Sequence, residues 1–283
     1  MLFAGASGFL GQRVLKLLVS QNIDTIVIGR NHFQGVPASN FLSCDLLSTS
    51  DFGDLVKSVG ATHLLHLAWY AEHGEYWKSH LNLRWVDATV RLTEAFCLAG
   101  GKRIVVAGTC AEYDWSYGYC SEANTPLQPA TLYGNAKDVT RRLVTAVCKE
   151  YQVACAWGRV FMPYGPGEDR RRLIPSLVDV FAGKRAPFGV NASAYRDFLH
   201  VDDVASGFFA LLKDEAEGAF NISSAQPLLI ADVVKWLAKA GKADPEIVLS
   251  LNSERQAEPN LLVGENTKLM GIGWRPRHEF CLD

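Results

Sequence analysis

The sequence predicts an α/β protein built on a doubly wound parallel sheet, with a smaller, interleaved C-terminal region. Two features predict it. Short apolar runs alternate with helical patterns through the first half of the 283-residue chain, which is typical of parallel sheets. The first run, at 1–4, leads through Gly5-Ala6-Ser7-Gly8-Phe9-Leu10-Gly11 into a helical pattern. Strand, glycine turn and helix in this order are typical of a Rossmann-like fold.

The elements follow from the spacing of apolar residues, which differs between strands and helices. In the first half, the expected strands are 1–4, 25–28, 41–44, 63–68, 103–108 and 153–157, and the expected helices are 12–19, 51–56, 82–99 and 138–151. After Arg159 the alternation breaks at a stretch rich in proline and glycine, 163–167. Beyond this break, the sequence predicts helices at 174–181, 203–212 and 231–240 and an extended segment at 195–201.

Composition and charge exclude several classes of function. The chain has 48% hydrophobic and 20% charged residues and a net charge of −2, so nothing global draws it to nucleic acid or an anionic membrane. No apolar run approaches the roughly 20 residues that span a bilayer, and we expect no signal peptide. The cysteines are odd in number and scattered, without a CxxC pair. We therefore expect reduced thiols, no metal site and a cytoplasmic location.

The glycine turn is the first candidate site. Glycine adopts positive φ and lets the backbone approach a ligand, and a helix start presents unpaired N–H groups and a positive dipole end to a pyrophosphate. The GxxGxxG spacing is similar to that of short-chain dehydrogenases/reductases. We expect a dinucleotide to contact Gly5, Ser7, Gly8, Phe9, Leu10 and Gly11. The dinucleotide-binding domain would comprise 1–162, completed by 194–216, and the smaller substrate-binding region 163–193 and 217–283.

The residues after the second and third strands indicate which dinucleotide binds. A fold that prefers NAD usually has an acidic residue about 20 positions after the glycine turn. Here Arg30 stands near that distance from Gly11, with Asn31 beside it, and a guanidinium would pair with the 2′-phosphate of NADP. A solvated arginine at a strand end is the alternative. Asp45 and Leu46 fit an adenine contact, although such a dipeptide is also common in turns. The expected cofactor is NADP, with NAD as the alternative.

A second group of residues suits acid–base chemistry. Tyr133 and Lys137 form a YxxxK pair, and on a helix they would lie one turn apart on the same face. An ammonium there lowers the pKa of the phenol and can hold a ribose hydroxyl. Thr109, at the end of the fifth expected strand, could supply a hydroxyl that orients a carbonyl or an alcohol. The sequence therefore predicts Thr109, Tyr133 and Lys137 as the catalytic residues.

These motifs together resemble the extended short-chain dehydrogenases/reductases, the NAD-dependent epimerase/dehydratase family that acts on nucleotide sugars. The resemblance runs nearly end to end, through 5–11, 66–68, 109–113, 133–137, 164–167, 196–203, 220–222 and 273–276. It implies Tyr133 as the acid/base, Lys137 as its partner and Thr109 as the third member of the triad. A nucleotide-diphosphate sugar is the implied partner, and we expect a homodimer.

The resemblance also implies further contacts. Cofactor contacts would come from Leu67, Ala68 and Val160, besides Tyr133 and Lys137. Substrate contacts would come from Thr109, Phe161, Met162, Arg172 and Arg196. Arg196 would hold the diphosphate, which suits a charged bidentate donor. Arg172 also belongs to a charged run, 168–172, that solvation alone could explain.

Departures from the family pattern bear on the reaction. Sugar 4,6-dehydratases place an acidic pair directly after the threonine, where this chain has Cys110 and Ala111, so we do not expect dehydration. Glu112 comes one position late and would face the opposite side of a continuing strand. Met162 stands where sugar epimerases have an asparagine, and Trp85 also replaces a usual asparagine.

Two reactions and one binding role remain. A reductase would reduce a keto group, usually at C4 of a (deoxy)hexose, with hydride from nicotinamide and a proton from Tyr133. An epimerase would take hydride and return it to the other face. The expected NADP preference favours net reduction, because cells keep that pool reduced. A regulatory protein that binds NADP without turnover would have no need of the triad. We predict a reductase ahead of an epimerase.

Overall fold

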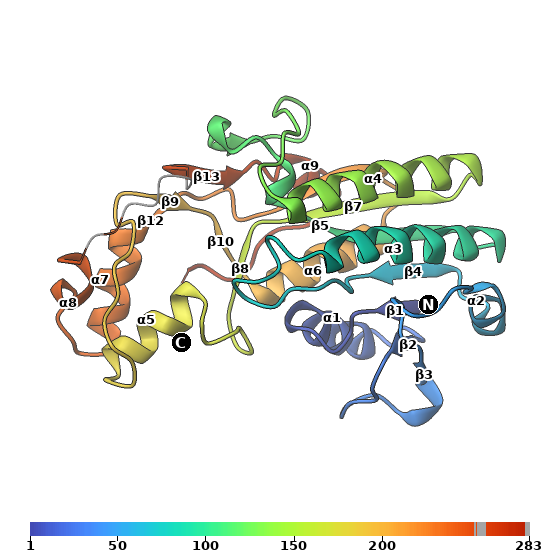
Figure 1. The fold of residues 1–283 in the computed structure, drawn as a ribbon, viewed down its shortest axis with the longest axis horizontal. Coiled ribbons are helices and arrows are strands. Elements are labelled where there is room, and N and C mark those ends of the chain that lie inside the picture. The colour runs from blue at the N-terminus through green and yellow to red at the C-terminus, as the bar shows by residue number, and fades with distance from the viewer. Residues whose placement is uncertain (252, 254–258, 281–283) are drawn as a thin grey trace.

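The computed structural model describes residues 1–251, 253 and 259–280, and its centre is a seven-stranded sheet (Figure 1). All neighbouring strands of this sheet are parallel, in the order β11-β7-β5-β4-β1-β2-β3. The strands are β1 (Leu2–Ala4), β2 (Ile26–Gly29), β3 (Phe41–Ser43), β4 (His63–His66), β5 (Arg103–Thr109), β7 (Ala154–Val160) and β11 (Gly218–Ile222). The strand order reverses between β1 and β4, and doubly wound sheets bind ligands at this switch point. The predicted fold class is confirmed.

Two helix layers cover the sheet because successive strand residues point to opposite faces. Phe3 joins the core cluster beneath α1 and α6, whereas its neighbours Leu2 and Ala4 join the cluster beneath α2, α3 and α4. All three side chains are fully buried. The helices are α1 (Phe9–Ser20), α6 (Val201–Lys213), α2 (Gly53–Val59), α3 (Leu81–Leu98) and α4 (Leu132–Glu150).

A smaller lobe lies beside the sheet and is seen at the left of Figure 1. Its helices pack around a separate apolar cluster, and two short sheets, β12-β9-β13-β6 and β10-β8, connect it to the larger lobe. Its elements are α5 (Leu173–Phe181), α7 (Ile230–Ala240), α8 (Glu246–Leu249), β6 (Tyr119–Cys120), β8 (Met162–Tyr164), β9 (Tyr195–Arg196), β10 (Phe198–His200), β12 (Leu228–Leu229) and β13 (Leu261–Gly264). Helix α9 (Thr267–Gly271) follows β13 and returns to β11 of the large sheet.

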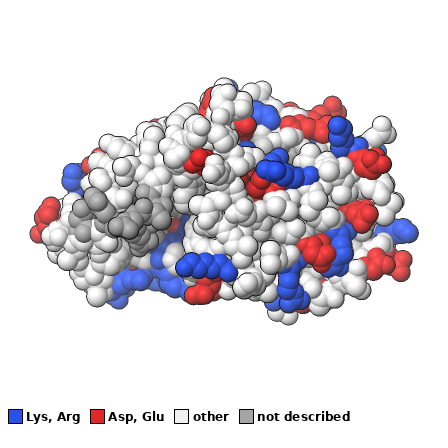
Figure 2. Space-filling model, turned by 45° about the horizontal axis from the view of Figure 1, so that its top comes forward, with Lys and Arg blue, Asp and Glu red and all other residues white. Residues whose placement is uncertain are grey.

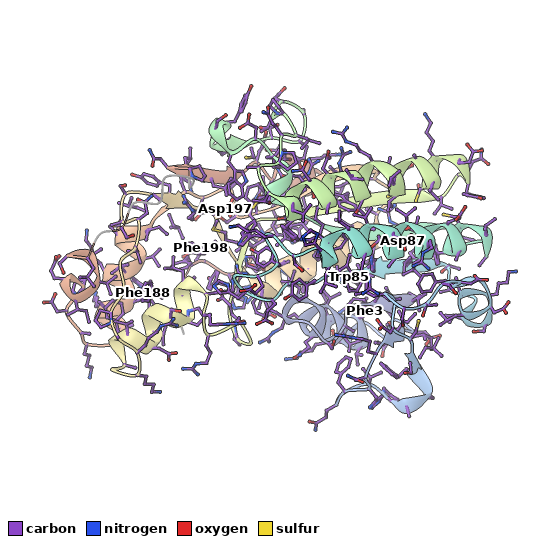
Figure 3. All side chains as sticks on the ribbon, viewed as in Figure 1. Phe3, Trp85, Asp87, Phe188, Asp197 and Phe198 are labelled. Carbon is purple, nitrogen blue, oxygen red and sulfur yellow. The ribbon has the colours of Figure 1, made fainter. Side chains whose placement is uncertain are left out.

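Asp197 ties the two lobes together. It lies between them in Figure 3 and is completely buried. Its carboxylate accepts hydrogen bonds from the N–H of Ser224 at 2.7 Å and from those of Ala225 and Gly264 at 3.1 Å. The corner between β9 and β10 is thereby fixed to the end of β11 and to β13.

The boundaries of several elements differ from those expected from the sequence. The largest shift is at α4, which begins at Leu132 and not at 138. The reason is a helix cap, because the Thr131 hydroxyl accepts a hydrogen bond from the N–H of Gly134 at 3.0 Å. Tyr133 therefore lies in the first turn of a helix, as the YxxxK prediction required. The strands β6, β8, β11, β12 and β13 were not predicted.

One of the unpredicted strands bears on the domain boundaries. Strand β11 lies at the edge of the large sheet, paired with β7, although the sequence analysis assigned 217–283 to the smaller region. We propose the same two-part division with β11 moved to the dinucleotide-binding part.

The surface and the cysteines give two further observations. Acidic and basic side chains are interspersed over the face shown in Figure 2, and none of the described helices is both long and apolar enough to cross a membrane. Six cysteines are free thiols. The seventh, Cys281, lies outside the described residues.

Candidate active site

The glycine turn has the geometry of a phosphate cradle. Gly5 has φ of +96°, and a Cβ there would lie 2.4 Å from the backbone nitrogen of Ala68. A Cβ on Gly11 would lie 2.0 Å from the carbonyl oxygen of Gly5. Both positions therefore require glycine for close packing of strand, turn and helix. Gly8, in contrast, is exposed and has ordinary space above it. This space is where a ligand would approach the backbone.

The start of α1 suits an anion. Gly8 caps the helix without a side-chain hydrogen bond, so the first N–H groups have no side-chain cap. A cavity of about 450 Å³ borders this helix start and is lined by Ser7, Phe9, Gln12, Arg13, Lys16, Pro166 and Gly167. Two of the lining side chains are cationic. The residues at the turn thus fit the pyrophosphate of a dinucleotide.

The predicted adenosine contacts lie at the ends of β2 and β3. Arg30 and Asn31 are exposed directly after β2, where a ribose phosphate would be accessible to them. Asp45 Oδ1 accepts a hydrogen bond from the N–H of Leu47 at 3.2 Å, so this carboxylate also shapes the turn. Leu46 is buried in the core beneath α3. The structure therefore shows the turn, and the adenine contact of Asp45 and Leu46 stays a prediction.

The predicted triad meets at the carboxyl end of β5. Thr109 is the last residue of β5 and Tyr133 is in the first turn of α4. A side-chain hydrogen bond joins Thr109 to Tyr133 and favours the phenolate, but burial has the larger effect, so the pKa of Tyr133 is raised. The structure thus differs from the expectation that Lys137 would lower this pKa. The phenol keeps its proton at neutral pH.

Lys137 lies one turn along α4 and is held away from solvent. It is only 3% exposed, its Nζ donates a hydrogen bond to the carbonyl oxygen of Ala107 at 2.9 Å, and Nζ lies 3.8 Å from the centre of the Trp69 ring. Burial lowers its pKa to about 7, and the charge of Glu112 acts in the opposite direction. The ammonium is therefore sensitive to nearby charges in the neutral pH range.

Trp69 is a functional candidate that the sequence analysis missed. Its ring stacks on Trp85 at 6.0 Å between centres, and its Nε1 donates a hydrogen bond to Oδ1 of the fully buried Asn82 at 2.8 Å. Figure 3 shows Trp85 near the start of α3. The position of Trp69, directly after Leu67-Ala68 at the end of β4, was the signal that could have identified it. Its indole provides a fixed cation–π surface for Lys137.

An aromatic wall, formed by Tyr76, Trp77 and Trp115, was also missed. The Tyr133 ring meets Tyr76 edge-on at 4.8 Å and Trp77 at 5.7 Å, and Trp115 meets Trp77 at 6.2 Å. The carbonyl oxygen of Trp77 accepts a hydrogen bond from the N–H of Tyr133 at 3.2 Å. The apolar faces of sugar rings pack well on such surfaces. The sequence signal was an aromatic pair in the loop that follows β4.

Glu112 is not placed for proton transfer. The strand ends at Thr109, and Cys110–Glu112 form a 3-10 turn that returns the Glu112 side chain beneath the strand end. The side chain is completely buried, with Oε2 2.7 Å from Nε of Arg159. Cys110 and Ala111 are buried as well. Cys110 and Ala111 thus stand at the positions of the dehydratase pair, and the absence of dehydration stays a prediction.

The predicted cofactor contact Val160 ends β7 and pairs with Thr109 of β5. The predicted substrate contacts Phe161 and Met162 follow it directly. Phe161 packs in an apolar cluster with Cys110, and the half-buried Met162 packs against the same cluster. The structure therefore places the Phe161 side chain in the core beside the triad.

The two predicted arginines lie on different elements. Arg196 is 6% exposed, and its guanidinium donates a hydrogen bond to the carbonyl oxygen of Pro259 at 2.8 Å. Arg172 pairs with Glu168 at 2.9 Å, and its charge acts on the pKa of Tyr76. Arg172 therefore lies near the aromatic wall beside Tyr133.

Comparison with known proteins agrees with this site. The profile of the NAD dependent epimerase/dehydratase family matches residues 1–223. The UDP-glucose 4-epimerase of Lacticaseibacillus casei is 24% identical over 310 residues, which cover 97% of this chain and 91% of the relative. The dTDP-6-deoxy-L-talose 4-dehydrogenase (NAD(+)) of Aggregatibacter actinomycetemcomitans is 28% identical over 249 residues, which cover 83% of this chain and 88% of the relative.

A solved structure shares the fold. MoeE5 in complex with UDP-glucuronic acid and NAD has a TM-score of 0.83 at 24% sequence identity, covering 98% of this chain and 94% of its own. The matched range includes the glycine turn, Thr109, Tyr133 and Lys137, and the match confirms the resemblance noted in the sequence. The chain belongs to the NAD-dependent epimerase/dehydratase family.

Proposed function

We propose that this protein reduces the 4-keto group of a nucleotide-activated (deoxy)hexose, with NADPH as the reductant. The observation that carries the proposal is that Thr109, Tyr133 and Lys137 meet at the carboxyl end of β5, where the half-buried phenol of Tyr133 keeps its proton. A proton donor must hold its proton before the reaction, and burial favours that state.

Different residues of the chain would bind the cofactor, orient the substrate and transfer the proton. The start of α1 and Gly8 would hold the pyrophosphate of the dinucleotide, and Arg30 the ribose phosphate. When bound, the reduced nicotinamide supplies hydride to the carbonyl carbon. Thr109 orients the carbonyl oxygen, and Tyr133 donates its proton to that oxygen as the alcohol forms. Lys137 stabilises the phenolate that remains.

Epimerisation at C4 by the same residues is the second candidate. It is supported by the 24% identity to a UDP-glucose 4-epimerase over nearly the whole chain. The 28% identity to a 6-deoxysugar 4-dehydrogenase supports the redox reaction instead. A non-catalytic NADP-binding protein is less consistent with a complete triad. We also propose a homodimer in the cytoplasm.

A turnover screen tests the proposed function. The protein is mixed with NADPH and each member of a panel of nucleotide 4-keto sugars. The rate of NADPH oxidation is compared with that of a control reaction without sugar. The proposal predicts sugar-dependent oxidation with at least one member of the panel. Cofactor binding without oxidation on any member would support the regulatory alternative.

The cofactor preference depends on Arg30. We expect NADPH to bind more tightly than NADH by about 1–3 kcal/mol, the size of a charge-assisted hydrogen bond. Arg30→Ala should remove most of this difference, because an alanine cannot pair with the 2′-phosphate. Calorimetric titration of both cofactors measures it, with Lys239→Ala in the smaller lobe as a control. Equal affinities in the parent protein would refute the NADP assignment.

Arg196 tests the predicted diphosphate contact. Arg196→Ala should raise KM for the nucleotide sugar more than it lowers kcat, because a remote phosphate is held both before and during the chemistry. Steady-state kinetics across a range of sugar concentrations gives both parameters. If KM stays within roughly twofold of the parent value, the arginine serves the packing around Pro259 and not the substrate.

A further inference from the structure

The carboxylate of Glu112 lies directly beneath the predicted catalytic threonine. Its Oε1 accepts hydrogen bonds from the backbone N–H of Thr109 and from Nε1 of Trp157, both at 2.9 Å. Its Oε2 accepts one from Nε of Arg159 at 2.7 Å. The last residue of β5 is thus fixed by a side chain from the following turn, and that side chain is itself fixed by β7.

The absence of a side chain at Gly108 leaves space for the carboxylate of Glu112. A Cβ on Gly108 would lie 2.0 Å from Nε1 of Trp157 and 2.7 Å from Oε1 of Glu112. Any other residue at this position would push the carboxylate or the indole away from Thr109. Glu112 is completely buried and Arg159 is 2% exposed. A buried ion pair of this kind is not in itself a reason for stability, because desolvation offsets the attraction.

The negative charge of Glu112 also acts on Lys137. Both are attached to β5 near its end, Lys137 through the carbonyl oxygen of Ala107 and Glu112 through the N–H of Thr109. Burial of Lys137 disfavours its charged form, and Glu112 opposes this effect. Glu112 therefore helps the lysine to keep its proton.

The other titratable and charged groups around Lys137 come from each neighbouring element. His66 of β4 is buried, and its pKa is lowered to about 3, mainly by burial and also by Lys137. It is therefore neutral near pH 7. Tyr133, on the same helix as Lys137, is protonated. Arg159 of β7 and, at 4.0 Å, Arg141 of α4 pair with Glu112.

We propose that Glu112 is a positioning residue: its carboxylate, held by Trp157 and Arg159 of β7, fixes the backbone of Thr109 and places a negative charge beside the end of β5 to which Lys137 is bound. It transfers no proton and contacts no substrate. The kinetic part of this inference rests on the proposed function, whereas the effect on Lys137 can be measured in the protein alone.

The experiment is a titration of Lys137 by NMR, in protein whose lysines carry carbon-13 at Cε. The Lys137 signal is identified by its loss in Lys137→Met. Glu112→Gln, which keeps the shape of the side chain and removes its charge, should lower the titration midpoint of Lys137 by about one pH unit. The upper pH limit of kcat should fall by a similar amount. An unchanged midpoint in folded Glu112→Gln would overturn the proposal.

Two further variants distinguish the positioning of Thr109 from the effect of the Glu112 charge on Lys137 and from a general loss of stability. Glu112→Asp keeps the charge and the pairing with Arg159 but is too short to hold Thr109 as well. In Glu112→Asp, the titration midpoint of Lys137 should stay near that of the parent, while kcat per folded molecule falls about tenfold or more. Asp203→Asn removes another buried carboxylate, which binds the backbone of Arg277 and His278, and should lower stability without moving the midpoint.

The outcomes distinguish this inference from the proposed function. If the parent protein reduces no nucleotide keto sugar, the proposed function fails, but the NMR titration still decides the effect on Lys137. If Glu112→Gln does not fold, Glu112→Asp remains as the test. Parental kcat in folded Glu112→Asp would then overturn the positioning role.

Discussion

Tyr133→Phe should lower kcat by ~10²–10⁴-fold, the usual contribution of general acid–base catalysis. The substitution keeps the ring, and with it the edge-on contacts to Tyr76 and Trp77 at 4.8 and 5.7 Å. It removes only the hydroxyl that donates the proton. The affinity for the cofactor should change little. Steady-state kinetics and cofactor titration measure the two effects.

A thermal melt and a matched variant complete this test. Tyr151→Phe changes an exposed tyrosine at the end of the same helix and should retain parental activity. If Tyr133 were only a packing residue, Tyr133→Phe would lose stability and keep its activity per folded molecule. Near-parental turnover of folded Tyr133→Phe would therefore remove the support for a proton donor at this position.

Lys137→Met should reduce both kcat and cofactor affinity, by about 10²-fold and about tenfold respectively, because the lysine serves the phenolate and a ribose hydroxyl. The thermal unfolding midpoint of Lys137→Met should change by only a few degrees, because the buried ammonium contributes little net stability to the parent protein. Activity of the parent protein should also fall as pH rises above about 7, where Lys137 loses its proton.

Lys149→Met, an exposed lysine on the same helix, is the matched control and should behave as the parent. Kinetics, cofactor titration and a thermal melt on both variants separate the roles. A Lys137→Met variant that unfolds easily but keeps its cofactor affinity would show that the lysine is structural.

Much of the fold could be predicted because its signals are local. The glycine turn needs glycine at two points of close approach, and the strands of the large sheet other than β11 contain short apolar runs. The YxxxK spacing likewise predicted two residues on one face of α4. The smaller lobe was harder, because strands such as β9 and β12 contain two residues each and depend on pairing between distant segments.

The contacts of Glu112 were not predicted, because this residue was considered only on a strand that continued past Thr109, where it would face the opposite side. Thr109-Cys110-Ala111-Glu112 in fact has the spacing of a capping box, and both of its hydrogen bonds form. The approach of Arg159 and Trp157 comes from β7, and no local pattern predicts it.

The state of Tyr133 could not be predicted from spacing either. Lys137 lies one turn away, as expected, but Ala107 and the ring of Trp69 hold its ammonium. Burial then decides the pKa of the phenol. The spacing in the sequence predicts that Tyr133 and Lys137 lie close together. The protonation state of each side chain depends instead on how far the fold removes it from water.

The most direct test of the proposed function follows the hydride. The protein is mixed with a nucleotide 4-keto sugar and with NADPH that carries deuterium in place of the hydride transferred from C4 of the nicotinamide. The sugar product is analysed by mass spectrometry and NMR. The proposed reductase predicts one deuterium at C4 of the product for each cofactor oxidised. No cofactor oxidation and no deuterium in the product, together with interconversion of 4-hydroxy nucleotide sugars in a parallel reaction, would contradict it and identify an epimerase.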